Sequence, residues 1–255
     1  MSLIYKYYSN TNYSHENLKN KKICFTPLET LNDPFEGVGK IQILANDEKN
    51  LDLFNKSLEQ NSSEFIVEEF FNVANFKYRV FCATENPFDA AMWSYYANNH
   101  TGFCVAYDKD ELSSIEGTKW KTMDYFPEPH DLDQITVENF SNLVFQKSID
   151  WQQEQEYRGV YTLSKEDVCS IKFACPLCLD CSRYMTMVNP KNVVEDMVSL
   201  KYITKLCEPK AIYLGMYISD EDKLKLTTIG KELKVDMYIM QITPNSYKLY
   251  PQKIT

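Results

Sequence analysis

The pattern of hydrophobic and polar positions predicts short strands along much of the chain. Apolar residues alternate with polar ones, or form short continuous runs, at several places that are bounded by polar or turn residues. Successive side chains of a strand point to opposite faces of a sheet, so such runs are typical of strands. The predicted strands cover residues 3–7, 23–26, 78–84, 102–107, 120–126, 211–218 and 235–242.

Helices are predicted where apolar residues recur at spacings of three and four. The longest such stretch covers residues 47–77, in which Leu51, Phe54 and Leu58 begin a hydrophobic stripe. Residues 131–148 are amphipathic in the same way. Shorter helices are predicted at residues 16–19, 88–97 and 220–233, and a closing hairpin at residues 244–246.

Together these elements predict an α+β fold, a mixed or mainly antiparallel sheet with helical insertions. The 255 residues show no repeat and no linker, so we expect a single domain over residues 1–255. Hydrophobic residues make up 44% of the chain and aromatic residues 14%, which favours a packed globule over disorder. None of the seven glycines falls in a Rossmann or P-loop pattern, which argues against both of those nucleotide-binding folds.

Charge and targeting signals narrow the partners and the compartment. The net charge of −9 repels phosphate backbones, so bulk nucleic acid is not an expected partner. The N-terminus lacks the basic and apolar segments of a signal peptide, and no apolar run is long enough to span a membrane. We therefore expect a cytoplasmic protein without a membrane partner. The oligomeric state stays open.

The cysteines raise the question of a metal. A cytoplasmic chain with eight cysteines is expected to keep thiols or bind metal rather than form disulfides. Two C-x-x-C steps present thiolates to one metal, which would be zinc or an iron–sulfur cluster. Free cysteines are the alternative interpretation. The candidate ligands lie in the segment 168–182 and are Cys169, Cys175, Cys178 and Cys181.

An E-x-E-Y-R run is the most unusual pattern in the second half of the chain. Glu154 and Glu156 are expected on one face of a strand, where two carboxylates repel each other. Such a pair is left in solvent, neutralised by cations, or used for chemistry. In the structural interpretation Arg158, Lys6 or Arg79 neutralises it, and Arg158 shares the strand face of Glu156. In the functional interpretation the pair of glutamates belongs to an active site.

The segment Asn32-Asp33-Pro34-Phe35-Glu36 is a strong turn signal. Asn and Asp side chains bond their own backbone, and Pro fixes φ. Two interpretations are open, a purely structural turn and a turn that also places Glu36 near a pocket.

A predicted helix carries Trp93, Tyr95 and Tyr96. At helical spacing Trp93 and Tyr96 share one face and Tyr95 lies on another, so at least one ring should be exposed. Core packing and stacking on a base or nicotinamide are both compatible with this spacing. His100, which follows the helix, is either a hydrogen-bonded turn residue before Gly102 or a general acid–base group.

These motifs belong to a longer series with a fixed order along the chain. The series is Leu3-x-Tyr5-Lys6-Tyr7, Asn32-Asp33-Pro34-Phe35-Glu36, Met92-Trp93-Ser94-x-Tyr96-Ala97-x-x-His100-x-Gly102-Phe103-Cys104, Trp151-x-x-Glu154-x-Glu156-Tyr157-Arg158 and Ala211-Ile212-Tyr213-Leu214-Gly215. It resembles the bacterial family called domain of unknown function 2971, over nearly the whole chain. The resemblance implies no settled activity.

The chain is also similar, more distantly, to bacterial ADP-ribosyltransferase folds. This similarity implies that Glu156 is the catalytic acid, that Glu154 is its substrate-facing partner and that Tyr95 or Tyr96 stacks on nicotinamide. His100 and Arg158 are further catalytic candidates, taken from their own motifs. A carboxylate there would stabilise the oxocarbenium character that develops when the nicotinamide–ribose bond breaks. Lys6 stands where such folds carry Arg or His. The implied pocket for NAD is lined by Tyr5, Lys6, Tyr7, Asn32, Asp33, Trp93 and Tyr96.

Three functions are therefore open. The first is an NAD-using, ADP-ribosyltransferase-like enzyme, which could act as a defence or toxin component. The second is a nuclease whose magnesium is held by Asp33, Glu36, Glu154 and Glu156. The third is a non-catalytic sensor that binds a nucleotide-like small molecule in an aromatic groove.

Overall fold

The computed structural model describes residues 2–36, 40–41, 78–128, 131–132, 142–163 and 202–254. The predicted helix over residues 47–77 and the cysteine segment 168–182 lie outside these residues. The strands are β1 (Leu3–Tyr8), β2 (Lys22–Phe25), β3 (Lys40–Ile41), β4 (Tyr78–Thr84), β5 (Phe103–Asp108), β6 (Thr118–Thr122), β7 (Asp124–Phe126), β8 (Asp131–Leu132), β9 (Gln146–Ser148), β10 (Glu156–Thr162), β11 (Ile203–Leu206), β12 (Pro209–Leu214), β13 (Asp236–Ile242) and β14 (Leu249–Lys253). The helices are α1 (Asn12–Lys19), α4 (Ala90–Tyr96), α5 (Lys109–Ser113) and α10 (Asp220–Leu233), with the 3₁₀ helices η1 (Leu28–Thr30) and η2 (Ile149–Glu154).

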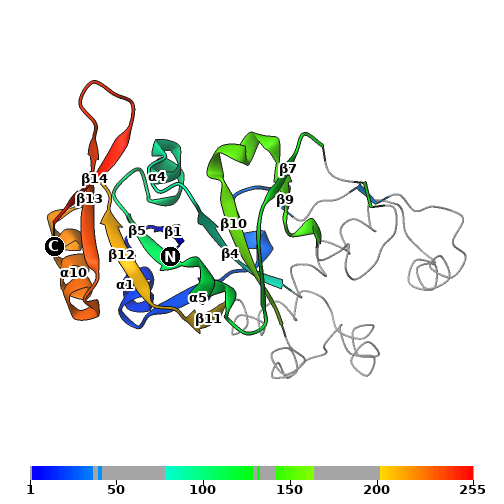
Figure 1. Ribbon diagram of the computed structural model, residues 1–255, viewed down its shortest axis with the longest axis horizontal. Coiled ribbons are helices and arrows are strands. Elements are labelled where there is room, and N and C mark those ends of the chain that lie inside the picture. Colours follow the sequence, from blue (N-terminus) through cyan, green and yellow to red (C-terminus); the bar gives the residue numbers. More distant parts are fainter. Residues whose placement is uncertain are drawn as a thin grey trace, which may run out of the picture.

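One large sheet organises the described residues, and it confirms the α+β prediction. Its eight strands follow the order β14-β13-β12-β5-β1-β4-β10-β6 (Figure 1). All neighbours in it are antiparallel except β12 and β13, which α10 connects. Strands β13 and β14 form the predicted hairpin, whose loop extends beyond the sheet in Figure 1. The sheet is therefore mixed and mainly antiparallel.

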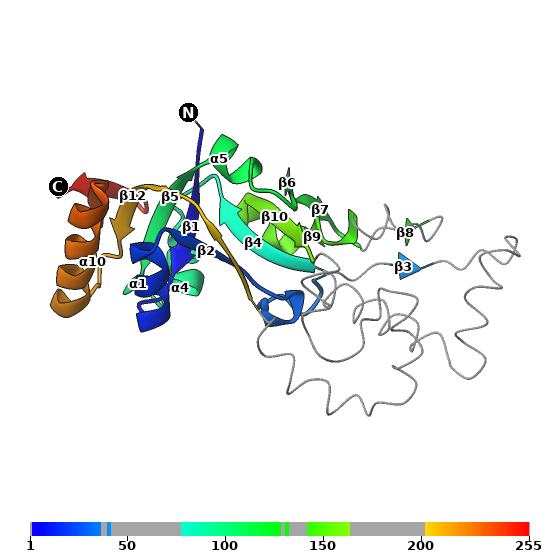
Figure 2. The same cartoon turned by 90° about the horizontal axis from the view of Figure 1, so that it is seen from below.

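Alternation along β1 shows how the two faces of the sheet are covered. Ile4 is fully buried in a core shared with residues of α1 and α10. Tyr7 points to the other face, where it packs against Trp93 of α4. Helices α1 and α10 lie side by side (Figure 2). Each face is thus closed by helices, and α4 covers the face on which Tyr5 and Tyr7 lie.

The sheet is incomplete between β1 and β4. These strands pair at a single position, Tyr5 with Thr84, whereas β1 pairs with β5 along its whole length. Further along β4, Val80 exchanges two backbone hydrogen bonds with Thr26, which follows β2. A gap is left between these two contacts, and Cys82 lies beside it. This gap positions the candidate site.

The prediction that Glu154 and Glu156 share one face of a strand is wrong. Glu154 is the last residue of η2, and β10 begins only at Glu156. Between them Gln155 adopts the left-handed conformation, with φ 45° and ψ 49°. The two carboxylates nevertheless meet, because both contact Lys147.

The prediction of a helix over residues 131–148 is wrong at both ends. Residues 131–132 form β8, which pairs with β3, and residues 146–148 form β9, which pairs in parallel with β7. Residues 133–141 lie outside the described residues. Pairing with a distant strand overrides the local helical periodicity here, as tertiary context often does.

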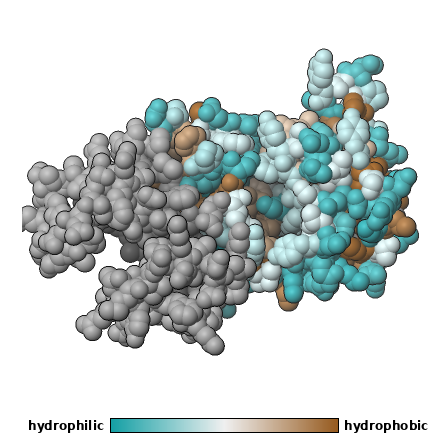
Figure 3. All heavy atoms as spheres, turned by 180° about the vertical axis from the view of Figure 1, so that it is seen from behind, coloured by the Kyte–Doolittle hydropathy of each residue, from teal (hydrophilic) through white to brown (hydrophobic). Residues whose placement is uncertain are grey.

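The described surface is mainly hydrophilic. In the view of Figure 3 hydrophobic residues are scattered among polar ones over the described part of the chain. The most exposed large apolar side chains, Leu206, Leu224 and Tyr247, belong to separate elements. Among the helices of the described residues, none has both the length and the apolar character needed to cross a membrane.

Candidate functional site

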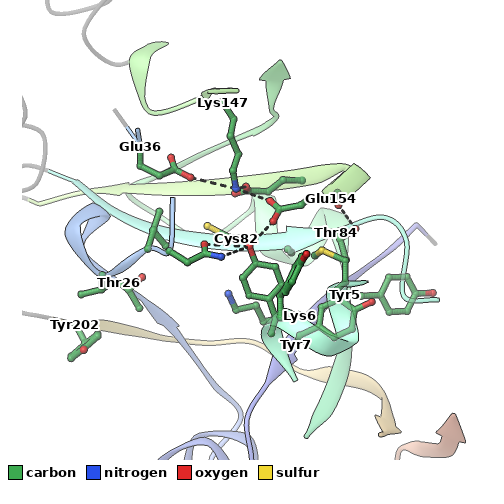
Figure 4. A pocket seen from close by; sticks show the side chains of 18 residues that line it. Tyr5, Lys6, Tyr7, Thr26, Glu36, Cys82, Thr84, Lys147, Glu154 and Tyr202 are labelled. Atoms are coloured by element: carbon green, nitrogen blue, oxygen red, sulfur yellow. Dashed lines mark hydrogen bonds and ion pairs between the residues drawn. The ribbon is translucent and has the colours of Figure 1, made fainter. Parts of the chain in front are cut away.

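A pocket of about 430 Å³ opens at the gap between β1 and β4 (Figure 4). This volume lies within the range of small-molecule sites. Residues from β1, from the turn after η1, from α4, from β9, from the end of η2 and from the start of β10 line it. They include Tyr5, Lys6, Tyr7, Asn32, Glu36, Tyr95, Tyr96, Lys147, Glu154 and Glu156.

One end of the pocket is a buried charge network, which consists of Glu36, Lys147, Glu154, Glu156 and Arg158. Arg158 is fully buried and contacts two of the carboxylates. Its Nη1 and Nη2 donate to the two oxygens of Glu36 at 2.6 and 2.7 Å. Its Nε donates to Oε1 of Glu156 at 2.6 Å, as the shared strand face predicts. Because bidentate pairing of this kind fixes geometry, Arg158 holds Glu36 and Glu156 in place.

Lys147 is the second cation of the charge network. Its ammonium lies 2.6 Å from Oε2 of Glu154, 3.3 Å from Oε2 of Glu156 and 3.5 Å from Oε1 of Glu36. It also lies over the ring of Trp151. A buried ammonium needs such partners because burial without them is costly. The network contains three carboxylates and two cations, so it carries one excess negative charge when all of its members are ionised.

Glu154 is the carboxylate of the network that Arg158 does not contact. Oε2 contacts Lys147, and Oε1 accepts a hydrogen bond of 2.5 Å from the Tyr96 hydroxyl. The Asn32 amide in turn donates to the Tyr96 oxygen at 3.0 Å. Glu36 and Glu156, by contrast, are both engaged by Arg158. The chain Asn32–Tyr96–Glu154 therefore connects the polar turn, α4 and η2 at the pocket wall.

The two neighbouring glutamates have opposite pKa shifts. Burial alone would raise the pKa of Glu156, but Arg158 and Lys147 outweigh it and lower the pKa to about 2. Burial raises the pKa of Glu154, and Lys147 and Tyr96 only partly oppose this. Burial and the nearby Glu154 also raise the pKa of Tyr96, so its hydroxyl stays a donor. Paired carboxylates whose pKa values are pushed apart are typical of acid–base sites.

Most of the residues that the sequence singled out meet at this pocket. Asn32 and Tyr96 are hydrogen-bonded to each other, and Arg158 lies directly behind Glu156. Tyr95 is 64% exposed whereas Trp93 is fully buried, which confirms that the rings of this helix face different environments. The predicted residues that line the pocket are Tyr5, Lys6, Tyr7, Asn32, Tyr96, Glu154 and Glu156.

Four of the predicted residues that the structure describes do not line the pocket, namely Arg158, which belongs to the charge network, and three that lie elsewhere. Trp93 lies in the core, and its Nε1 donates to the carbonyl of Pro87. Asp33 is buried, and its Oδ1 accepts from the amide of Phe35, as the turn interpretation requires. His100 packs edge-on against Tyr217. The structure thus brings none of these last three side chains to the charge network.

Lys147 is the functional candidate that the sequence did not reveal. It lies in a segment whose periodicity predicts a helix, and an isolated lysine carries no signal of its own. The sequence indicates the need for such a cation only indirectly. Two carboxylates in an aromatic setting require a cation, and the sequence offers Arg158, Lys6 and Arg79 for this role. Lys147 is identified only by its contacts with Glu36, Glu154 and Glu156 in the folded chain.

The described residues offer no obvious metal site. Among them, no group of three or more His, Cys, Asp or Glu side chains is arranged to hold an ion. Their cysteines, Cys24, Cys82, Cys104 and Cys207, are free thiols. Burial raises the pKa of Cys82 and of Cys207 to about 12, so neither is a reactive thiolate. The four predicted metal ligands between residues 168 and 182 lie outside the described residues.

Comparison with known proteins supports the family resemblance. Residues 92–159 match the family described as Protein of unknown function (DUF2971). The matched segment contains Tyr96, Lys147, Glu154, Glu156 and Arg158, and so four of the five members of the charge network. No curated protein and no solved structure matches the chain.

Proposed function

We propose that the protein binds a nucleotide-like molecule in this pocket and breaks its N-glycosidic bond, as an NAD-using, ADP-ribosyltransferase-like enzyme does. Water or a second molecule would accept the sugar. In this proposal Glu154 is the catalytic carboxylate, Tyr96 and Lys147 position it, and Glu156 with Arg158 supports Lys147 from behind. This assigns to Glu154 the role that the sequence similarity gives to Glu156.

The observation that carries the proposal is the position of Glu154 in the pocket lining, outside the contacts of Arg158, within a network of excess negative charge. Cleavage of an N-glycosidic bond leaves positive charge on the sugar carbon C1′, and a fixed carboxylate stabilises that charge. Both oxygens of Glu154 are held, by Tyr96 and Lys147, yet each retains a lone pair for a ligand. A pre-positioned carboxylate stabilises the transition state without having to reorganise.

The bond-breaking step uses only groups at this end of the pocket. The bond between C1′ and the base nitrogen breaks, and its electron pair leaves with the base. A nicotinamide-type base leaves uncharged, because it is cationic while bound. Water then adds to C1′ and releases a proton, for which Glu154 is a suitable acceptor because burial raises its pKa.

Aromatic side chains form the other walls. Tyr5 packs edge-on against Tyr213, and Tyr7 against Trp93, so the two β1 rings are held rigidly. Tyr95 stands exposed next to Tyr96 on α4. Rings held in this way offer flat apolar surfaces to a base or a nicotinamide. They support a planar heterocycle as part of the ligand.

The decisive experiment compares the wild type with Glu154→Gln in the presence of NAD. The wild type should release nicotinamide, measured by chromatography, and the variant should be slower by about 100-fold or more because a fixed charge is lost. Glu111→Gln, on exposed α5 and outside the pocket, is the matched control. Full activity in Glu154→Gln would overturn the assignment. Binding of NAD without any cleavage would favour the sensor.

A magnesium-dependent nuclease is the second candidate. Glu36, Glu154 and Glu156 converge on Lys147, although they are not arranged to hold an ion and Asp33 stays outside. Lys147 contacts all three carboxylates, so a cation already occupies the place that magnesium would need. Incubation of DNA and RNA with the protein and magnesium distinguishes the two functions. Cleavage that disappears in Glu36→Gln would favour the nuclease.

A further inference from the structure

The geometry points to Lys6 as the residue that binds a phosphoryl group of the ligand, so that the pocket selects nucleotides over nucleosides. The inference rests on the proposed function in one respect, namely that a nucleotide-like molecule occupies the pocket. It adds the specificity that this site would have.

Lys6 reaches the pocket through the gap in the sheet. Strand alternation places it on the face opposite Tyr5 and Tyr7, and its ammonium lies 5.2 Å from the ring centre of Phe81, which belongs to the core of that opposite face. All three β1 side chains nevertheless line one pocket. This is possible because β1 and β4 pair only at Tyr5 and Thr84.

The surroundings of Lys6 differ from those of the other pocket lysine. Lys147 contacts three carboxylates. Within the described part of the chain, no carboxylate forms an ion pair with Lys6, whose ammonium instead lies over the ring of Phe81. The ammonium of Lys6 acts electrostatically on the thiols of Cys24, Cys82 and Cys104, but burial raises the pKa of each, so none of them is an anion at neutral pH. An anionic ligand group is what this ammonium lacks.

The two lysines enter the pocket from opposite sides (Figure 4). The pocket is therefore polarised, with excess negative charge at Glu154 and positive charge at Lys6. A ribose with a developing positive charge fits the first end, and a phosphoryl group attached to that ribose fits the second. A neutral nucleoside would leave Lys6 without a partner. A ligand that carries both groups satisfies both ends.

Binding measurements on unreactive ligands test this inference separately from catalysis. Calorimetry would compare ADP-ribose with adenosine, neither of which contains the nicotinamide bond. The wild type should bind ADP-ribose more tightly, and Lys6→Met should weaken that binding by about 10- to 100-fold, since a charged hydrogen bond is lost. Adenosine binding should not change, and Lys6→Arg should retain most of the affinity for ADP-ribose.

Lys119→Met is the matched control. Lys119 also lies on a strand with its ammonium over a phenylalanine ring, that of Phe145, but outside the pocket. Its substitution should leave both affinities unchanged, and near-UV circular dichroism confirms that each variant is folded. Equal affinity of the wild type for the two ligands, binding of neither, or an unchanged affinity in Lys6→Met would each overturn the inference.

The two proposals can fail independently. Binding of ADP-ribose that depends on Lys6, together with no cleavage of NAD, would leave the phosphoryl site standing and remove the catalytic role of Glu154. Cleavage that depends on Glu154, together with unchanged binding in Lys6→Met, would leave the catalytic role of Glu154 standing and remove the phosphoryl site.

Discussion

Two ion pairs of nearly equal length in this protein have very different settings. Nη1 of Arg158 lies 2.6 Å from Oε2 of Glu36, and Nζ of Lys253 lies 2.8 Å from Oδ1 of Asp236. The first pair is 0% and 2% exposed, whereas the second, between β13 and β14, is 55% and 53% exposed. Water screens the second pair and cannot reach the first. Distance therefore says little about either pair, and burial decides what each contributes.

The largest expected effect follows from removing the buried guanidinium. Arg158→Met would leave Glu36 and Glu156 buried beside Lys147 alone, with two uncompensated negative charges in the network. Breaking a buried pair by removing one partner costs about 3–5 kcal/mol, so we expect a loss of that size in the free energy of unfolding. Urea denaturation at pH 7 measures it.

A double replacement shows whether the loss comes from the stranded charges. Arg158→Met combined with Glu36→Gln should recover part of the stability that the single variant loses, because one orphan carboxylate is removed. A double variant that is no more stable than Arg158→Met would contradict this explanation.

A smaller effect is expected from pH, with opposite signs at the two glutamates. The pKa of Glu156 is lowered in the folded state, so its stabilisation is fully present above about pH 4.5 and is lost as the pH falls towards about 2. The pKa of Glu154 is raised, so its contribution is fully present below about pH 4.5 and is lost as the pH rises through its folded-state pKa. Glu154 therefore makes the protein less stable at neutral pH.

Glu154→Gln isolates that contribution. The variant should melt at the same temperature as the wild type or higher at pH 7.5, and this advantage should shrink as the pH falls and the wild-type carboxylate takes up a proton. Melting curves recorded from pH 7.5 downwards provide the measurement. A difference in melting temperature that is independent of pH would contradict the raised pKa. A carboxylate that lowers stability while facing a pocket is what a functional residue is expected to be.

The contrast between the two ion pairs also explains what the sequence could predict. The region around Asp236 is specified locally. Turn residues after β13 predict the hairpin, and the helical pattern predicts α10 at its observed residues 220–233. The positions of Glu154 and Lys147, by contrast, depend on contacts between different segments and on irregular backbone. The left-handed Gln155 and the short parallel strand β9 leave no periodic pattern to read.

The same reasoning explains the outcome for the candidate site. Motifs in the sequence selected Tyr5, Tyr96 and Glu156 correctly as neighbours of one pocket. They did not separate Tyr96, which lines the pocket, from Trp93, which fills the core, because both obey helical spacing. Nor did they distinguish the two glutamates, since only the folded structure shows that Arg158 contacts Glu156 whereas Tyr96 and Lys147 hold Glu154.

The smallest expected effect lies at the exposed pair. Asp236→Asn and Lys253→Met each remove one partner between β13 and β14, yet both side chains are about half exposed and find water instead. Neither variant should shift the urea midpoint measurably at 150 mM salt, and their double variant should behave as the sum of the two. A loss comparable to that of Arg158→Met would mean that burial does not separate the two pairs. Equal losses at a buried and at an exposed pair of similar length would show that desolvation does not set what each pair contributes.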